Sequence, residues 1–149
     1  MNCEVMAAIR GLQFLEEEDG EQIEVITPAE YYLRNDAHYL IYEEVDEDNG
    51  ARTKNMLKYK DHVLELTKKG AVNVHMIFEE QKKNITSYGT PFGNIMIGID
   101  TSRVSLTEQE NKISIRADYS MDVNYERLAD CKICVDICPR EDGGKLLAQ

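Results

Sequence analysis

The chain has 149 residues, of which 42% are hydrophobic and 30% are charged. This length suits one domain with its own core, and the composition is too apolar for a disordered chain. The formal net charge is −11, and no basic block is longer than Lys68-Lys69 or Lys82-Lys83. The sequence therefore predicts neither a nucleic-acid partner nor binding to an anionic membrane surface.

The first residues, MNCEVMAAIRGLQFL, carry Glu4 and Arg10 inside their apolar stretch. No run in the sequence approaches the roughly 18 apolar residues of a membrane span, and the start lacks the pattern of a signal peptide. We therefore expect a cytoplasmic protein, in which the four cysteines stay reduced.

Short segments of period-two alternation follow one another along the chain. Strands are predicted at 4–14, 22–34, 37–44, 53–59, 62–68, 72–78, 95–99, 102–107, 113–125 and 131–138. The segment 62–68 could also form two helical turns, but Lys60-Asp61 before it and Gly70 after it favour a hairpin arm.

Turn signals such as Asp19-Gly20, Asn35-Asp36 and Glu110-Asn111 recur at intervals of roughly ten residues, which is typical of an antiparallel barrel or sandwich. We expect an all-β fold, a single antiparallel barrel of about eight to ten strands. It covers residues 1–138, and 139–149 form a C-terminal tail outside the sheet.

The clearest alternation lies at 113–125, where every odd-numbered residue is apolar or tyrosine and the even-numbered residues are polar. A period of two places one set on the core and the other in water. This register turns Tyr119, Met121 and Tyr125 inward. They either line a ligand pocket or simply fill the core, and core filling is the more common role of such residues.

The segment SYGTPFGN, residues 87–94, has two interpretations. Pro91, Gly89 and Gly93 favour a plain turn between two strands. Alternatively, the segment forms a barrel rim where Tyr88, Thr90 and Asn94 offer polar contacts around Phe92. Tyr88, Thr90 and Phe92 join Tyr119, Met121 and Tyr125 as the candidate ligand-binding set.

The cysteines of DCKICVDICPRE invite a metal or iron–sulfur interpretation. A bacterial-type cluster needs a fourth cysteine, and Leu128 stands where it belongs. On a strand, Cys131 and Cys134 point to opposite faces. A zinc site would have to combine Cys134 and Cys138 with Cys3 from the first strand, and the favoured interpretation is that Cys131 is a small core residue.

Other sites are not indicated by the sequence. The acidic segments around 16–24 and 43–50 do not match a calcium loop and are interpreted as solvated hairpin tips. His38, His62 and His75 are scattered, without metal-ligand spacing. No nucleophile motif is present, so we predict no catalytic residues and no cofactor.

Between Lys68 and Ile99 the chain resembles the YwiB-like family of small bacterial proteins. The resemblance rests on Gly70, Asn73, Phe78, Tyr88 and Thr90-Pro91-Phe92-Gly93. It extends over the paired tyrosines of YYLRNDAHYLIYEE and covers roughly residues 4 to 138. It implies a calycin-type, lipocalin-like barrel and no reaction. The chain has no tryptophan, so the signature of secreted lipocalins is missing.

These observations favour a non-catalytic module that binds a small apolar or amphipathic molecule. The alternative is a protein-interaction or scaffold module with a filled barrel, and a second alternative is a cysteine-based metal site involving Cys3, Cys131, Cys134 and Cys138. A homodimer is compatible with either of the first two hypotheses. An enzyme is not favoured, because no nucleophile–base pair or metal motif is apparent.

Overall fold

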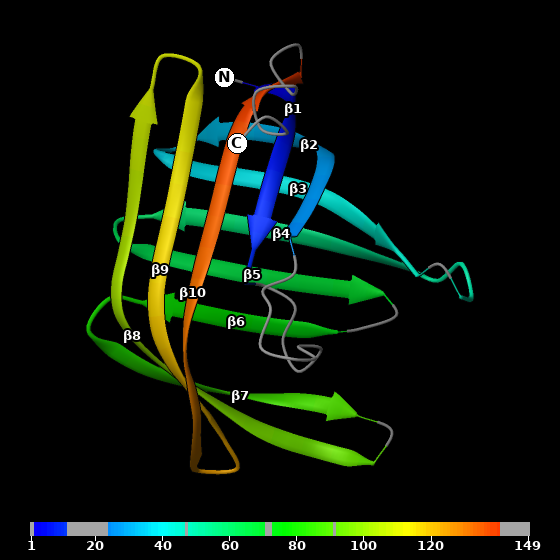
Figure 1. Ribbon diagram of the computed structural model, residues 1–149, viewed down its shortest axis with the longest axis vertical. Helices are drawn as coiled ribbons and strands as arrows, with labels where there is room; N and C mark the ends of the chain where they lie inside the picture. Colours follow the sequence, from blue (N-terminus) through cyan, green and yellow to red (C-terminus); the bar gives the residue numbers. More distant parts are fainter. Residues whose placement is uncertain (1, 12–23, 47, 71–72, 91, 141–149) are drawn as a thin grey trace.

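One antiparallel sheet contains all the strands in the described part of the chain (Figure 1). The computed structural model describes residues 2–11, 24–46, 48–70, 73–90 and 92–140. The strands are β1 (Asn2–Arg10), β2 (Glu24–Arg34), β3 (Ala37–Val45), β4 (Arg52–Lys60), β5 (Val63–Gly70), β6 (Val74–Glu79), β7 (Lys82–Thr90), β8 (Gly93–Gln109), β9 (Lys112–Val123) and β10 (Glu126–Pro139). The predicted all-β antiparallel fold is confirmed.

The strand order makes the sheet close on itself. It runs β6-β5-β4-β3-β2-β1-β10-β9-β8-β7, so the first strand pairs with the last. The two end strands, β6 and β7, approach each other, and the Thr86 hydroxyl on β7 donates a hydrogen bond to the His75 carbonyl on β6 at 2.8 Å. The sheet is therefore nearly closed into a barrel.

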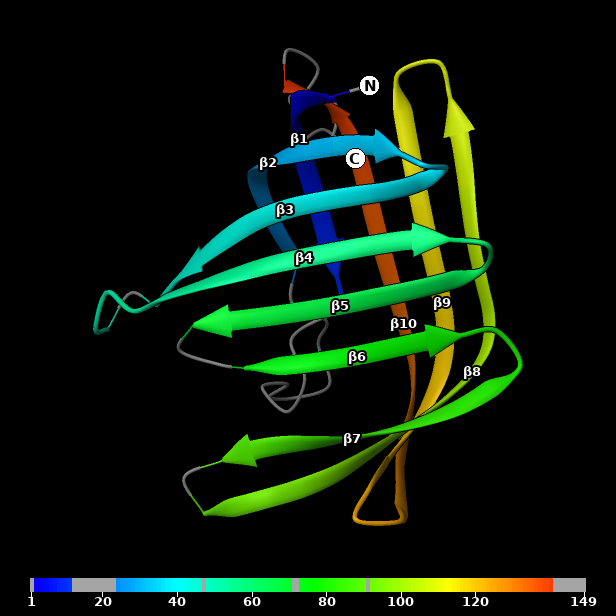
Figure 2. The same cartoon turned by 180° about the vertical axis from the view of Figure 1, so that it is seen from behind.

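The barrel is built from two sets of strands that cross each other (Figures 1 and 2). Strands β2 to β6 run side by side across one side, and β8 to β10 together with β1 run across the other. The crossing resembles the orthogonal packing of two sheets, with the core between them. The two sets share one hydrophobic cluster, which includes residues from all strands except β7.

Four hairpins in the described part of the chain have two-residue turns: β2–β3, β4–β5, β8–β9 and β9–β10. In three of them both central residues have positive φ: Asn35-Asp36, Asp61-His62 and Asn124-Tyr125. Positive φ at both positions matches the right-handed twist of the paired strands. The turn at Asp61-His62 confirms the hairpin interpretation of the segment that follows it, which forms β5.

Two parts of the sheet differ from the predicted elements. The segments 95–99 and 102–107 are not separate strands but belong to the single strand β8, whose register shifts at a bulge between Thr101 and Arg103. Strand β7 was not predicted, because its sequence KKNITSYGT begins with polar residues and lacks an apolar alternation. It is held in the sheet by backbone pairing with β8, which its side-chain pattern does not indicate.

Strand β2 leaves a gap beside β3. It pairs with β1 over its length from Glu24 to Tyr32, but its ladder with β3 ends at Glu30↔Ile41. Pro28 has no N–H to donate, which is compatible with an unpaired edge at this point. The wall of the barrel is therefore not continuous between the first half of β2 and the second half of β3.

Strand β10 ends at Pro139, the first residue of the predicted C-terminal tail. Residues 141–149 lie outside the described part. No helix long and apolar enough to cross a membrane occurs among the described residues.

Candidate ligand-binding site

The predicted ligand-binding residues occupy different environments. Tyr119 and Met121 are buried in the core, and the Tyr119 ring meets the Phe78 ring edge-on with centroids 4.8 Å apart. Phe92 lies fully exposed beside the β7–β8 turn, and Tyr125 lies in the β9–β10 turn. The inward alternation therefore ends at Val123, because the chain reverses before Tyr125. The side chains of Tyr88 and Thr90 lie outside the described part.

The cysteines of β10 also point in different directions. Cys131 packs against the main core, whereas Cys138 lies in a separate small cluster with Ala8, Met6 and Ile26 on the outer face. Cys134 lies partly exposed on that outer face. The side chain of Cys3 is not described, although β1 does lie next to β10. Among the described residues no group of three or more His, Cys, Asp or Glu side chains could hold a metal ion.

The middle of the barrel interior is filled by apolar side chains. Leu64, Met76 and Phe78 are 0% exposed. A side chain without accessible area borders no void large enough for water. These residues therefore leave no room for a ligand deep in the centre of the barrel.

One end of the interior is polar instead. Its inward positions carry Tyr42 and Glu44 on β3, Thr53 and Asn55 on β4, and Lys68 on β5, which we call the polar end. The placement follows from strand alternation, because residues two apart on a strand face the same side. On each of the three strands a buried leucine, Leu40, Leu57 or Leu66, lies on the same side as the polar residues. Hairpins β3–β4 and β4–β5 then bring the five side chains side by side.

Glu44 is the centre of the polar end. Its Oε1 accepts hydrogen bonds from Lys68 Nζ at 2.7 Å and from Asn55 Nδ2 at 2.8 Å. The Lys68 side chain is 11% exposed and that of Glu44 32%. Burial, and secondarily the negative charge of Glu44, raise the pKa of Tyr42 above its usual value. The Tyr42 hydroxyl therefore stays protonated at neutral pH.

Asn55 has an unsatisfied acceptor. It is 0% exposed, and both amide hydrogens have acceptors, Glu44 Oε1 and the Thr53 carbonyl. Its Oδ1 has no hydrogen-bond partner. Exchanging the amide oxygen and nitrogen would aim an oxygen at the Glu44 carboxylate, so the geometry supports the orientation as it stands. A buried acceptor without a donor costs about 1–3 kcal/mol, and such groups call for an explanation.

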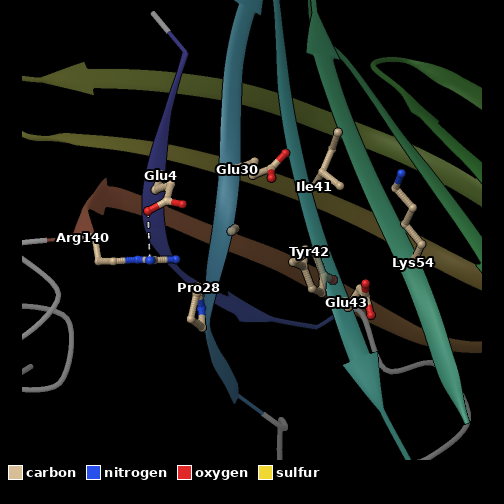
Figure 3. A pocket seen from close by; sticks show the side chains of 9 residues that line it. Glu4, Pro28, Glu30, Ile41, Tyr42, Glu43, Lys54 and Arg140 are labelled. Atoms are coloured by element: carbon tan, nitrogen blue, oxygen red, sulfur yellow. Dashed lines mark hydrogen bonds and ion pairs between the residues drawn. The ribbon is translucent and has the colours of Figure 1, made fainter.

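A groove opens on the outside of the same wall, where β2 and β3 separate (Figure 3). It has a volume of about 320 Å³. Its lining, which we call the β2–β3 groove, consists of Glu4, Pro28, Ala29, Glu30, Ile41, Tyr42, Glu43, Lys54 and Arg140. Tyr42 belongs to both the groove and the polar end, and its cross-strand partner is Asn55. The volume falls at the lower end of the range for small-molecule sites, about 300–1,000 Å³.

The opposite end of the barrel carries a second inward polar group. The Tyr31 hydroxyl lies 2.6 Å from His38 Nδ1, and the His38 ring contacts the Tyr59 ring edge-on with centroids 6.0 Å apart. Burial lowers the pKa of His38, although the nearby Glu108 carboxylate opposes this effect. The neutral imidazole can accept a hydrogen bond from the Tyr31 hydroxyl at Nδ1. No polar side-chain atom of Tyr31, His38 or Tyr59 is buried without a hydrogen-bond partner in the described part of the chain, unlike Asn55 Oδ1 in the polar end.

The polar end was missed in the sequence, although its signal was present. Glu44 has the same parity as the buried Leu40 and Tyr42, and Lys68 the same parity as Leu64 and Leu66. A charged residue that continues an apolar alternation is the pattern of an inward-facing charge. The segment that contains Glu44 was instead interpreted from its acidic composition as a solvated hairpin tip, and 62–68 was interpreted only as a hairpin arm.

Comparison with known proteins supports the fold. A family model described as a domain of unknown function (DUF1934) matches residues 8–135. The chain is also similar to the crystal structure of the ywiB protein from Bacillus subtilis, with a TM-score of 0.67 and 22% identity over 93% of this chain and 89% of that one. Comparison with curated proteins gave no match. Because this family model matches residues 8–135, the chain belongs to the DUF1934 family.

Proposed function

We propose that this protein is a non-catalytic binding module for a small amphipathic molecule, and that the ligand's polar group sits at the polar end. The observation that carries the proposal is the buried Asn55 Oδ1, which has no donor. A ligand N–H or O–H would supply that donor after the neighbouring side chains move aside, because Asn55 is 0% exposed in the structure. We further propose that the module acts in the cytoplasm.

Lys68 provides a second proposed contact for the ligand's polar group. Its Nζ donates to Glu44 and, as an ammonium, has two further hydrogens to donate. An acceptor on the ligand can take one of them. The ligand would thus carry a donor and an acceptor close together, as in an amide or a hydroxy acid. Leu57 and Leu66, the next inward residues on the same strands, are 1% and 0% exposed, so they would contact the ligand's remaining atoms only after the same movement of side chains.

The β2–β3 groove provides an entry route in this proposal. Pairing between β2 and β3 stops at Glu30↔Ile41, so no ladder hydrogen bonds need to break there before a ligand reaches Tyr42. Because the middle of the barrel is filled, the ligand has to remain near this wall. This restriction favours a molecule smaller than the ligands of hollow barrels.

The experiment compares the thermal unfolding of protein as purified with that of protein unfolded, dialysed and refolded. A bound ligand stabilises the native state by RT ln(1 + [L]/Kd), so the refolded sample should melt at a lower temperature. Adding the small-molecule extract released on unfolding should restore the original melting temperature. Identical melting curves, with no response to the extract, would contradict the proposal.

A protein-interaction module is the alternative, and one surface favours it. The outer face of the β2–β3 hairpin forms a broad depression of about 860 Å³, lined by Tyr32, Leu33, Arg34, Asn35, Tyr39 and Ile41. Aromatic and arginine side chains are enriched at protein interfaces. This module would retain a partner protein on gentle purification and would melt identically before and after refolding.

A further inference from the structure

A second pocket lies on the outer face of the other set of strands. It has a volume of about 360 Å³. Its lining, which we call the cationic pocket, comprises Arg103, Ser105, Arg116, Asp118, Lys132, Ile133 and Cys134. It contains three cationic side chains and one carboxylate, in a chain whose formal net charge is −11. We propose that this pocket binds a small phosphate-type oxyanion, independently of the polar end.

The bulge in β8 creates this pocket. Before the bulge the inward residues of β8 are odd-numbered, as shown by the buried Ile99 and Thr101, whereas after it Val104 points inward. Without the shift, Arg103 would point into the core. Bulges reorient side chains in this way, often next to functional sites. The bulge therefore places Arg103 and Ser105 on the outer face.

Strand pairing then aligns the pocket residues in two rows. One row is Arg103, Asp118 and Lys132 on β8, β9 and β10, and the other is Ser105, Arg116 and Cys134 on the same strands. Neighbouring strands lie about 4.8 Å apart, so the three cations surround a space suited to one small anion. The Ser105 hydroxyl and the Cys134 thiol supply neutral donors beside them.

Arg116 is held in position from behind. Its Nη2 donates to Asp136 Oδ1 at 3.1 Å, and the same oxygen accepts from Ser114 Oγ at 2.7 Å. The Asp136 side chain is only 9% exposed, whereas that of Arg116 is 42% exposed. Arg116 Nη1 also donates to the Ile115 carbonyl at 3.1 Å. The guanidinium is thus held at both terminal nitrogens, and its remaining N–H groups are available to an anion.

The charges of Arg103 and Lys132 are not neutralised by ion pairs in the described part of the chain. Neither has an ion pair with a carboxylate in the part of the chain that the structure describes, although Asp118 is the cross-strand neighbour of both. Two unpaired cations in a strongly acidic protein favour a mobile anion as their partner. An extended polyanion or an anionic membrane would be repelled by the remaining charge, whereas a small ion is screened and can enter. This argument selects a free oxyanion such as inorganic phosphate or a phosphomonoester.

The test titrates inorganic phosphate into the protein by isothermal calorimetry at pH 7.5, against sodium chloride of equal ionic strength. We expect saturable one-site binding. Arg103→Ala/Lys132→Ala should weaken it about tenfold or more, since two charge-assisted contacts are lost. Asp118→Asn should strengthen it severalfold, because a repulsive carboxylate is removed. Arg116 is left intact, since its loss would also expose Asp136.

The matched control is Lys60→Ala/Lys69→Ala, which removes the same two charges from exposed positions on β4 and β5. This control should bind phosphate as the wild type does. Glycerol 3-phosphate distinguishes the two sources of the anion: tighter binding than phosphate identifies a phosphomonoester, and equal binding identifies inorganic phosphate. Failure of the wild type to saturate, or equal weakening in both double variants, would overturn the proposal. Asn55→Leu should leave phosphate binding unchanged, which separates this test from that of the proposed function.

Discussion

The middle of the barrel interior and its polar end are built on the same strands but from opposite kinds of side chain. On β5, Leu64 and Leu66 point into the filled middle and Lys68 points into the polar end. The middle is packed with apolar side chains, although the Thr101 hydroxyl beside it also lacks a partner. In the polar end the unpartnered atom, Asn55 Oδ1, lies among charged and polar side chains instead. From this difference we infer that the packed middle stabilises the fold, whereas the polar end is available for ligand binding.

The largest effect should come from the filled middle. Phe78→Ala removes a fully buried ring that packs against Tyr119, and it should lower the free energy of unfolding by about 3–5 kcal/mol, measured by urea denaturation. Ile85→Ala, at a half-exposed position on β7, should change it by less than about 0.5 kcal/mol. A loss below about 1 kcal/mol for Phe78→Ala would show that the middle is not tightly packed.

The polar end should respond in two opposite ways. Lys68→Ala leaves Glu44 without its ammonium and should cost about 1–3 kcal/mol of unfolding free energy. Glu44→Leu/Asn55→Leu/Lys68→Met replaces the whole cluster by apolar groups and should be neutral or stabilising by about 1–4 kcal/mol. Thermal and urea unfolding of the two variants measure this difference. A triple variant less stable than Lys68→Ala would mean that the polar end is structural.

Acidification tests the opposite end of the barrel. Burial lowers the folded-state pKa of His38 below its ordinary value of 6.5, so the unfolded chain takes up a proton first as the pH falls. The contribution of His38 to stability is present above pH 6.5 and declines below it. His38→Gln should therefore show a smaller drop in melting temperature between pH 7.5 and 5.5 than the wild type. An unchanged or larger drop would contradict this account of His38.

The smallest effect concerns Tyr125, which lies outside both regions. Its positive φ of 69° is unfavourable for a bulky residue, and its side chain is 76% exposed. Tyr125→Gly should raise the free energy of unfolding by about 0.5–1 kcal/mol. Ligand retention, measured by mass spectrometry, should stay the same. Loss of the ligand in this variant would show that Tyr125 contributes to ligand binding.

Much of the fold could be predicted from the sequence, because alternation and turn chemistry are local properties. The predicted alternation at 113–125 appears in the structure as far as Val123, and the turn predicted at Lys60-Asp61 lies one residue later, at Asp61-His62. Strand β7 was missed because it lies at one end of the sheet and its ladder with β8, rather than an apolar alternation, holds it in place.

The candidate sites were less accessible to prediction, for two physical reasons. The polar end depends on which strands are neighbours, and only the parity of Glu44 and Lys68 signals it. The cationic pocket depends on the bulge after Thr101, which reverses the parity of Arg103. No local sequence pattern indicates this shift in register. Strict alternation from Thr101 would have predicted Arg103 in the core.

The central claim, that the polar end holds a small ligand, is tested most directly by native mass spectrometry of the protein as purified. The wild type should carry an organic adduct that is absent from its denatured mass. Asn55→Leu and Lys68→Met should each lose the adduct, whereas Asn111→Leu, in the β8–β9 turn, should keep it. A bare wild-type mass, or an adduct retained equally by all the variants, would contradict the account.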